Sequence, residues 1–309
     1  MIFLAIKKWG IIMKKKVLIF IVSLLLILVG FFLYPSYKTA ELKEADNQYL
    51  TEMENPDADI ETPATTDNEL IEDLATDETA TEEPNIDNQD KVIVIDAGHQ
   101  QKGDLSKEPI GPGASEQKAK VTYGNVGVKT GTPEYQLNLE IALKLQIELE
   151  ARGYTVIMCR TDNDVNMSNS ERAAIANEAN ADAFIRIHCN GYDSSSVHGA
   201  MTMCQTENNP YNGNRYEESR LLSECVLDYL VDETGCKKQN IFEDDSMSGI
   251  NWSMVPVTIV EVGYLSNPDE EAKLVTDDYQ QKLAVGIANG VDAYIAAREA
   301  NTDIEEELK

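Results

Sequence analysis

VIVIDAGH, residues Val92–His99, is a short apolar run that ends on a histidine. The run AFIRIH at Ala183–His188 has the same form, and the run VTIVE at Val257–Glu261 ends on a glutamate. Short apolar runs separated by helical stretches are typical of buried strands in a parallel sheet. The carboxyl ends of such strands meet at the edge where open α/β sheets bind ligands. We therefore expect the two histidines and the glutamate to converge at one edge of a sheet.

Two imidazoles and a carboxylate are the ligands that a catalytic Zn²⁺ takes from a protein, with a fourth position left for water. A lone histidine at a strand end is more often a hydrogen-bonded polar residue than a ligand. A glutamate at a helix start, such as Glu134, is more often a partner of the helix dipole. The convergence of several such residues outweighs these alternatives and indicates a metal-dependent hydrolase.

Strands and helices alternate from Lys91 to about Arg298, which predicts a single α/β domain with a mainly parallel sheet and helices on both faces. The apolar residues of 137–149 alternate with period two, but a strand of that length is improbable and the residues between them favour helix. We therefore expect a buried helix. The expected elements are a helix that begins at Thr132-Pro133-Glu134 and ends at Gly153, a strand at Tyr154–Cys159, a helix from the capping box Ser168–Glu171 to about Asn180, and helices at Tyr216–Glu233 and Tyr279–Ala297.

Residues 1–35 contain a membrane-targeting pattern. Lysines precede the apolar run Val17–Leu33, which is near the lower limit for a helix that spans a bilayer. No clear small-x-small cleavage site follows it, so we expect an uncleaved single-pass anchor, with a cleaved signal peptide as the alternative. Both interpretations place the rest of the chain outside the cytoplasm, as a membrane-anchored domain or as a secreted protein.

Residues 36–90 differ in composition and are rich in acidic residues, threonine and proline. Such a segment cannot bury enough apolar surface to order itself, so we expect a disordered linker before a domain at 91–298 and an acidic tail at 299–309. The formal net charge of -28 makes nucleic acid an unsuitable partner.

The five cysteines lack the paired spacing of a structural zinc site, and we expect buried free thiols. Cys189 should face away from the site if His188 faces it.

Four segments of the domain, taken in order, resemble a known family, the zinc-dependent N-acetylmuramoyl-L-alanine amidases of the amidase 3 type. They are IDAGH at Ile95–His99, PEYQLNL at Pro133–Leu139, ADAFIRIHCN at Ala181–Asn190, which Asn177 precedes, and VEVGYLSN at Val260–Asn267. The resemblance extends from Val92 to about Ile295.

The resemblance implies an α/β domain built on a six-stranded sheet. It also implies hydrolysis of peptidoglycan between the lactyl group of muramic acid and the first L-alanine of the stem peptide. In that family the positions that match His99, Glu134 and His188 hold zinc, and the position that matches Glu261 is catalytic. Zinc activates water and polarises a carbonyl, and we expect Glu261 to move the proton to the leaving nitrogen.

The chain departs from the family pattern at Ala97 and Gln100, where the family commonly has proline and glycine, so the loop after His99 is expected to differ. Arg186 replaces a small polar residue; it either pairs with a buried acidic residue, which we favour, or binds a substrate carboxylate. The insertion at 100–131 is long for a loop without regular structure and is a candidate wall of the glycan groove.

Trp252, Asp245 and Asn251 are candidates for substrate contacts, with loop packing as the favoured interpretation. His198 lies in a serine-rich turn and is expected to be exposed. Two other functions stay open, a zinc peptidase that acts on another cell-wall amide bond and an inactive wall-binding module. An inactive module is expected to lack a ligand or the glutamate, and the chain lacks none of them.

Overall fold

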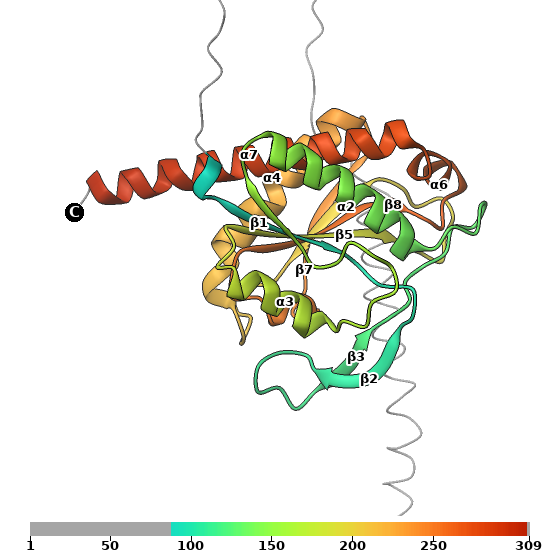
Figure 1. The fold of residues 1–309 in the computed structure, drawn as a ribbon, viewed down its shortest axis with the longest axis horizontal. Coiled ribbons are helices and arrows are strands. Elements are labelled where there is room, and N and C mark those ends of the chain that lie inside the picture. Colours follow the sequence, from blue (N-terminus) through green and yellow to red (C-terminus); the bar gives the residue numbers. More distant parts are fainter. Residues whose placement is uncertain (1–87, 308–309) are drawn as a thin grey trace, which may run out of the picture. The chain divides into compact units, whose positions relative to one another are not determined.

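The computed structural model describes residues 88–307. They form an α/β domain around a six-stranded sheet with the strand order β4-β1-β5-β8-β6-β7 (Figure 1). Neighbouring strands are parallel, except that β6 runs antiparallel to β8. The strands are β1 (Val92–Ala97), β4 (Thr155–Met158), β5 (Ala183–Asn190), β6 (Ala200–Cys204), β7 (Lys238–Glu243) and β8 (Val257–Tyr264). The predicted mostly parallel α/β sheet is confirmed.

Helices cover both faces of this sheet. In Figure 1, α2, α4 and α7 lie on one side of the strands and α3 lies on the other. One apolar cluster joins the sheet to α2, α4 and α7, and a second joins it to α3 and α5. The helices are α2 (Glu134–Ala151), α3 (Asn169–Glu178), α4 (Tyr216–Thr234), α5 (Ser248–Asn251), α6 (Pro268–Leu274) and α7 (Asp277–Glu307), with short 3-10 turns at Asn88–Asp90 and Gly213–Arg215.

The side chains of strand β5 alternate between the two faces of the sheet, and this alternation places His188. Ile185, Ile187 and Cys189 belong to the apolar cluster under α2, α4 and α7. The intervening side chains, among them Arg186 and His188, therefore lie on the opposite face of the strand. This confirms that Cys189 points away from His188. All five cysteines are free, and Cys225 and Cys236 are only partly buried.

Helix α2 confirms the choice of helix over strand at its period-two stretch. Its buried stripe has helical spacing and consists of Leu137, Ile141, Leu145 and Leu149. The helix begins one residue later than expected, with Pro133 at the N-cap. The expected burial does not extend to Ile147, which is 66% exposed.

The other boundaries differ from the expectations by small amounts. The capping box at Ser168 is present, and α4 ends at Gly235, which has the left-handed φ of 65°. Helix α7 continues to Glu307 rather than ending near Ala297, because no glycine or proline interrupts the sequence there. The described residues begin at Asn88, whose buried side chain donates a hydrogen bond to the Arg152 carbonyl.

The insertion at 100–131 has regular structure, so the expectation of an irregular loop was wrong. It contains an antiparallel hairpin of β2 (Asp104–Pro109) and β3 (Gln117–Val121), which extends away from the main sheet (Figure 1). Their sequences, DLSKEP and QKAKV, lack the apolar alternation that marks a strand.

The apolar run Val17–Leu33, expected as an anchor, and the acidic linker as far as residue 87 lie outside the described residues. Within residues 88–307, no helix combines the length and the apolar character that crossing a membrane requires.

Candidate metal centre and active site

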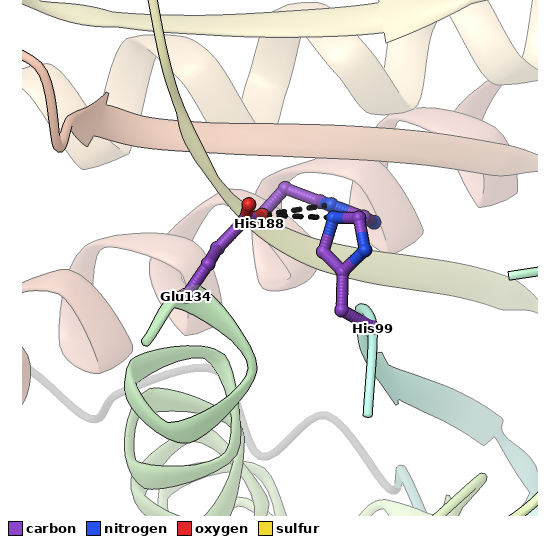
Figure 2. Close-up of side chains that lie close together, drawn as sticks. All are labelled: His99, Glu134 and His188. Atoms are coloured by element: carbon purple, nitrogen blue, oxygen red, sulfur yellow. Dashed lines mark hydrogen bonds and ion pairs between the residues drawn. The ribbon is translucent and has the colours of Figure 1, made fainter. Parts of the chain in front are cut away.

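Three side chains converge at the carboxyl edge of the sheet: the two histidines predicted to meet there, and Glu134, which the family resemblance indicated. His99 follows β1, Glu134 is the first residue of α2, and His188 lies near the end of β5. One oxygen of Glu134, Oε1, lies 3.1 Å from Nε2 of His99 and 3.2 Å from Nδ1 of His188 (Figure 2). One potential ligand atom from each residue lies within 4.8 Å of the others. This spacing suits a single metal ion between the three side chains.

The orientation of His99 is set by the loop that follows the hairpin. Its Nδ1 lies 3.0 Å from the carbonyl oxygen of Thr122, so Nδ1 carries the proton and donates it there. The lone pair of Nε2 then faces the carboxylate of Glu134, which leaves two acceptors opposed unless a cation lies between them. His99 also has a φ of 61°, a strained conformation for a residue with a side chain, and such strain gathers at functional sites.

Glu134 is almost fully buried and is held as a charged carboxylate. Burial by itself would raise the pKa of Glu134, but the neighbouring His188 and His99 rings outweigh it and hold the pKa well below its usual range. Asn125 donates its backbone N–H to Oε2 at 2.7 Å, and Asn138 donates its side-chain amide to Oε1 at 3.3 Å. These donors fix the carboxylate in the form that binds a metal.

His188 is in the form that a metal requires. Burial lowers the pKa of His188 to about 4, so its ring is neutral at neutral pH. Its Nε2 is buried and has no hydrogen-bond partner among the described residues. A neutral imidazole, an ionised carboxylate and a second imidazole with a free lone pair match the donor set of a catalytic zinc site.

Glu261 lies beside this group. It is the register partner of His188 in the adjacent parallel strand β8, so the two side chains lie on the same face of the sheet. Its Oε2 is buried without a hydrogen-bond partner among the described residues. Burial, together with the negative charge of Glu134, raises the pKa of Glu261 well above its usual value. A raised pKa makes a carboxyl group a better proton acceptor, and the group can then donate the proton it has taken up.

Two glycines make room for the ligands. A Cβ on Gly98 would lie 2.3 Å from the His188 ring, and a Cβ on Gly124 would lie 2.8 Å from Oε2 of Glu134. Gly124 also has a φ of 89°. The sequence carries no distinct signal for Asn138, and the pair Gly124-Asn125 is too common a turn signal to identify these two residues as part of the site.

Arg186 pairs with a buried carboxylate, as favoured. Its Nε donates to Oδ2 of Asp96 at 3.0 Å, and Arg172 donates to the other oxygen of the same carboxylate. Burial by itself would raise the pKa of Asp96, but the two guanidinium groups hold it well below its usual range. Arg172 also donates to the His99 carbonyl and to the side chain of Gln100, so these charges brace the loop that carries the first ligand.

The remaining candidates pack elsewhere. The Trp252 indole donates to the Pro109 carbonyl, and Asp245 and Asn251 both accept hydrogen bonds from Asn209, which confirms loop packing for all three. His198 is exposed, as expected.

The hairpin forms one wall of a cavity next to the metal ligands. The cavity has a volume of about 320 Å³ and is lined by residues of both hairpin strands, by His99 and His188, and by the segment 246–249. The hairpin of the insertion therefore lines the cleft beside the metal ligands.

Comparison with known proteins agrees with this geometry. Residues 93–293 match the family model described as N-acetylmuramoyl-L-alanine amidase. The N-acetylmuramoyl-L-alanine amidase LytC of Bacillus subtilis is 30% identical over 185 residues, which are 60% of this chain and 34% of LytC. The chain thus matches about a third of that relative's length.

Two solved structures show the same fold. The catalytic domain of CwlV, an N-acetylmuramoyl-L-alanine amidase from Bacillus (Paenibacillus) polymyxa var. colistinus, is 30% identical with a TM-score of 0.54, and the match covers 67% of this chain and 98% of that one. The N-acetylmuramyl-L-alanine amidase Ami1 from Mycobacterium abscessus is 25% identical with a TM-score of 0.61, and the match covers 67% and 99% of the two chains.

Proposed function

The chain belongs to the N-acetylmuramoyl-L-alanine amidase family and is an amide hydrolase of peptidoglycan; we propose that it acts through one Zn²⁺ held by His99, Glu134 and His188. The observation that carries the proposal is that both histidine rings lie next to one oxygen of Glu134. The lone pair of His99 Nε2 faces this oxygen at 3.1 Å. The bond cut is the amide between the lactyl group of muramic acid and the first L-alanine of the stem peptide.

The protein's own residues account for the remaining chemistry. Bound zinc would lower the pKa of a water molecule and polarise the scissile carbonyl. Glu261 takes the proton from the attacking water and delivers it to the leaving amide nitrogen, a transfer that suits a carboxyl with a raised pKa. Thr122 and Asn125 keep His99 and Glu134 in the orientation that the site needs.

A zinc peptidase that cuts another cell-wall amide bond uses the same groups, so the products decide between the two activities. Purified peptidoglycan treated with the protein should yield intact stem peptides and glycan strands of unchanged length. New termini confined to the stem peptide or the cross-bridge, with glycan and peptide still joined, would favour the peptidase. The presence of all three ligands and of Glu261 argues against the inactive wall-binding module.

We further propose that residues 1–35 anchor the protein in the cell membrane with the catalytic domain outside the cytoplasm. The apolar run Val17–Leu33 behind five lysines supports the anchor. The similarity to the probable cell wall amidase LytH of Staphylococcus aureus supports only the location outside the cytoplasm. Membranes washed with carbonate should retain the full-length chain. Recovery of a shortened soluble chain that begins after Ala40 would favour a cleaved signal peptide and secretion to the wall.

A further inference from the structure

The cavity beside the metal ligands has a positive lining in a chain of strongly negative charge. Its charged residues are Lys107 and Lys118 of the hairpin and Arg186 of β5, and no aspartate or glutamate is among the described residues that line it. The net charge of the whole chain is -28. A cleft lined by charges of one sign attracts ligands of the opposite sign, so this cavity favours an anionic group.

Arg186 contributes a charge that its own partner does not fully balance. It shares the single carboxylate of Asp96 with Arg172, so two buried guanidinium groups face one buried carboxylate. Its Nε and Nη2 are taken up by Asp96 and Asn169. Its Nη1 lies against Gly249, where a Cβ would come within 1.8 Å, and Gly249 also lines the cavity. A glycine at this position keeps the guanidinium edge free of a covering side chain.

The two lysines approach from the hairpin wall. The ammonium group of Lys118 donates to Oγ of Ser246 at 3.1 Å, which holds its side chain across the cleft. Lys107 also lines the cavity and is exposed. Among residues 88–307, neither lysine forms an ion pair, whereas their neighbour Lys120 lies 3.8 Å from Asp104. The two ammonium groups are therefore available to a ligand.

The spacing indicates which part of the substrate reaches these charges. Arg186 and His188 are two residues apart on one strand face, a separation of about 7 Å. Two residues of an extended peptide also span about 7 Å. A stem peptide that runs from the metal ligands along β5 toward Arg186 would place its second residue at the level of Arg186.

We propose that this cavity binds a free carboxylate on the second residue of the stem peptide, an inference that rests on the proposed function. That residue is a glutamate joined to the next residue through its side chain, so its α-carboxyl is an anion in some walls and an amide in others. Lys118, Lys107 and the edge of Arg186 then make the protein specific for the unamidated form.

The test uses two synthetic muropeptides that differ only in this group, one with the α-carboxyl free and one with it amidated. The wild-type protein should have a kcat/KM about tenfold higher for the acid, as expected for a charged hydrogen bond. In the double variant Lys107→Gln/Lys118→Gln the ratio of the two kcat/KM values should fall toward one, and Lys118→Arg should retain it. Lys102→Gln removes a charge from the same insertion outside the cavity and should keep the wild-type ratio.

Equal kcat/KM values for the two muropeptides in the wild-type protein would overturn the carboxylate subsite. An equal loss on both in the double variant would also overturn it, because that pattern indicates a structural role. Failure of the wild-type protein to cut either substrate at the lactyl bond would instead count against the proposed function. Calorimetric titration with the two free stem peptides separates the cases, because the acid peptide should bind more tightly whether or not turnover occurs.

Discussion

His188 and Glu261 are register partners in the neighbouring parallel strands β5 and β8. This pairing brings a ligand of the metal centre and the candidate proton carrier to the same face and the same level of the sheet. Residues 73 positions apart in the sequence thus depend on one strand register. A slip of one residue would turn either side chain to the opposite face, so the apolar patterns of both strands also specify the site.

Glu261→Gln should retain zinc and lose turnover on peptidoglycan by about a hundredfold to ten-thousandfold, because the amide cannot accept the proton from water. Elemental analysis gives the zinc content, and release of stem peptides gives the rate. Activity close to wild type would require another base, and loss of zinc would make Glu261 a ligand instead.

His99→Ala and His188→Ala should each remove zinc from the purified protein, because each takes away one of three protein ligands. His198→Ala is the matched control, since His198 is exposed and lies outside the metal centre. Zinc is measured by elemental analysis after dialysis against a weak chelator. Equal zinc in the wild type and all three variants would contradict the ligand assignment.

Gly124→Ala should weaken zinc binding by about 10- to 100-fold, the usual effect of disturbing residues that orient metal ligands. The new Cβ would lie 2.8 Å from Glu134 and 2.9 Å from the His99 ring. Gly113→Ala is the control, because Gly113 has a similar φ of 77° but no atom within 4 Å of the added Cβ. Competition with a chromophoric chelator measures both affinities, and equal values for the two variants would show that strain alone is responsible.

Asp96→Asn should lower the free energy of unfolding by about 3–5 kcal/mol, because it leaves the buried guanidinium groups of Arg172 and Arg186 without a carboxylate. Urea unfolding of the metal-free protein at neutral pH measures the change without a contribution from zinc. Asp104→Asn, at the start of the hairpin, removes a carboxylate from a solvated ion pair and should have little effect. Equal destabilisation by the two substitutions would contradict the bracing role of Asp96.

The sequence was sufficient to predict the parts of the domain that follow from apolar periodicity. Strands β1, β5 and β8 and the residues at their ends, His99, His188 and Glu261, could be predicted because buried parallel strands are continuous apolar runs. The helix at Glu134 could be predicted from proline and the helix-forming residues behind it, although its first turn was placed one residue early.

The hairpin could not be predicted, because few of its strand residues are fully buried and their polar sequences carry no alternation. The same holds for β7, an edge strand that reads KQNIFE. The supporting contacts of the site, Asn125 to Glu134 and Thr122 to His99, join segments whose proximity depends on that hairpin. Contacts of this kind arise from tertiary structure, and local sequence carries little signal for them.

The most direct test of the central claim combines the metal and the bond in one measurement. Peptidoglycan is digested with the native protein, with the protein after removal of zinc, and with the same sample after zinc is restored, and new amino termini are labelled and identified. We predict new L-alanine termini with the native protein, their loss with the metal, and their return with added Zn²⁺. Alanine termini that persist without zinc, or new termini at another residue in the zinc-loaded protein, would contradict the account.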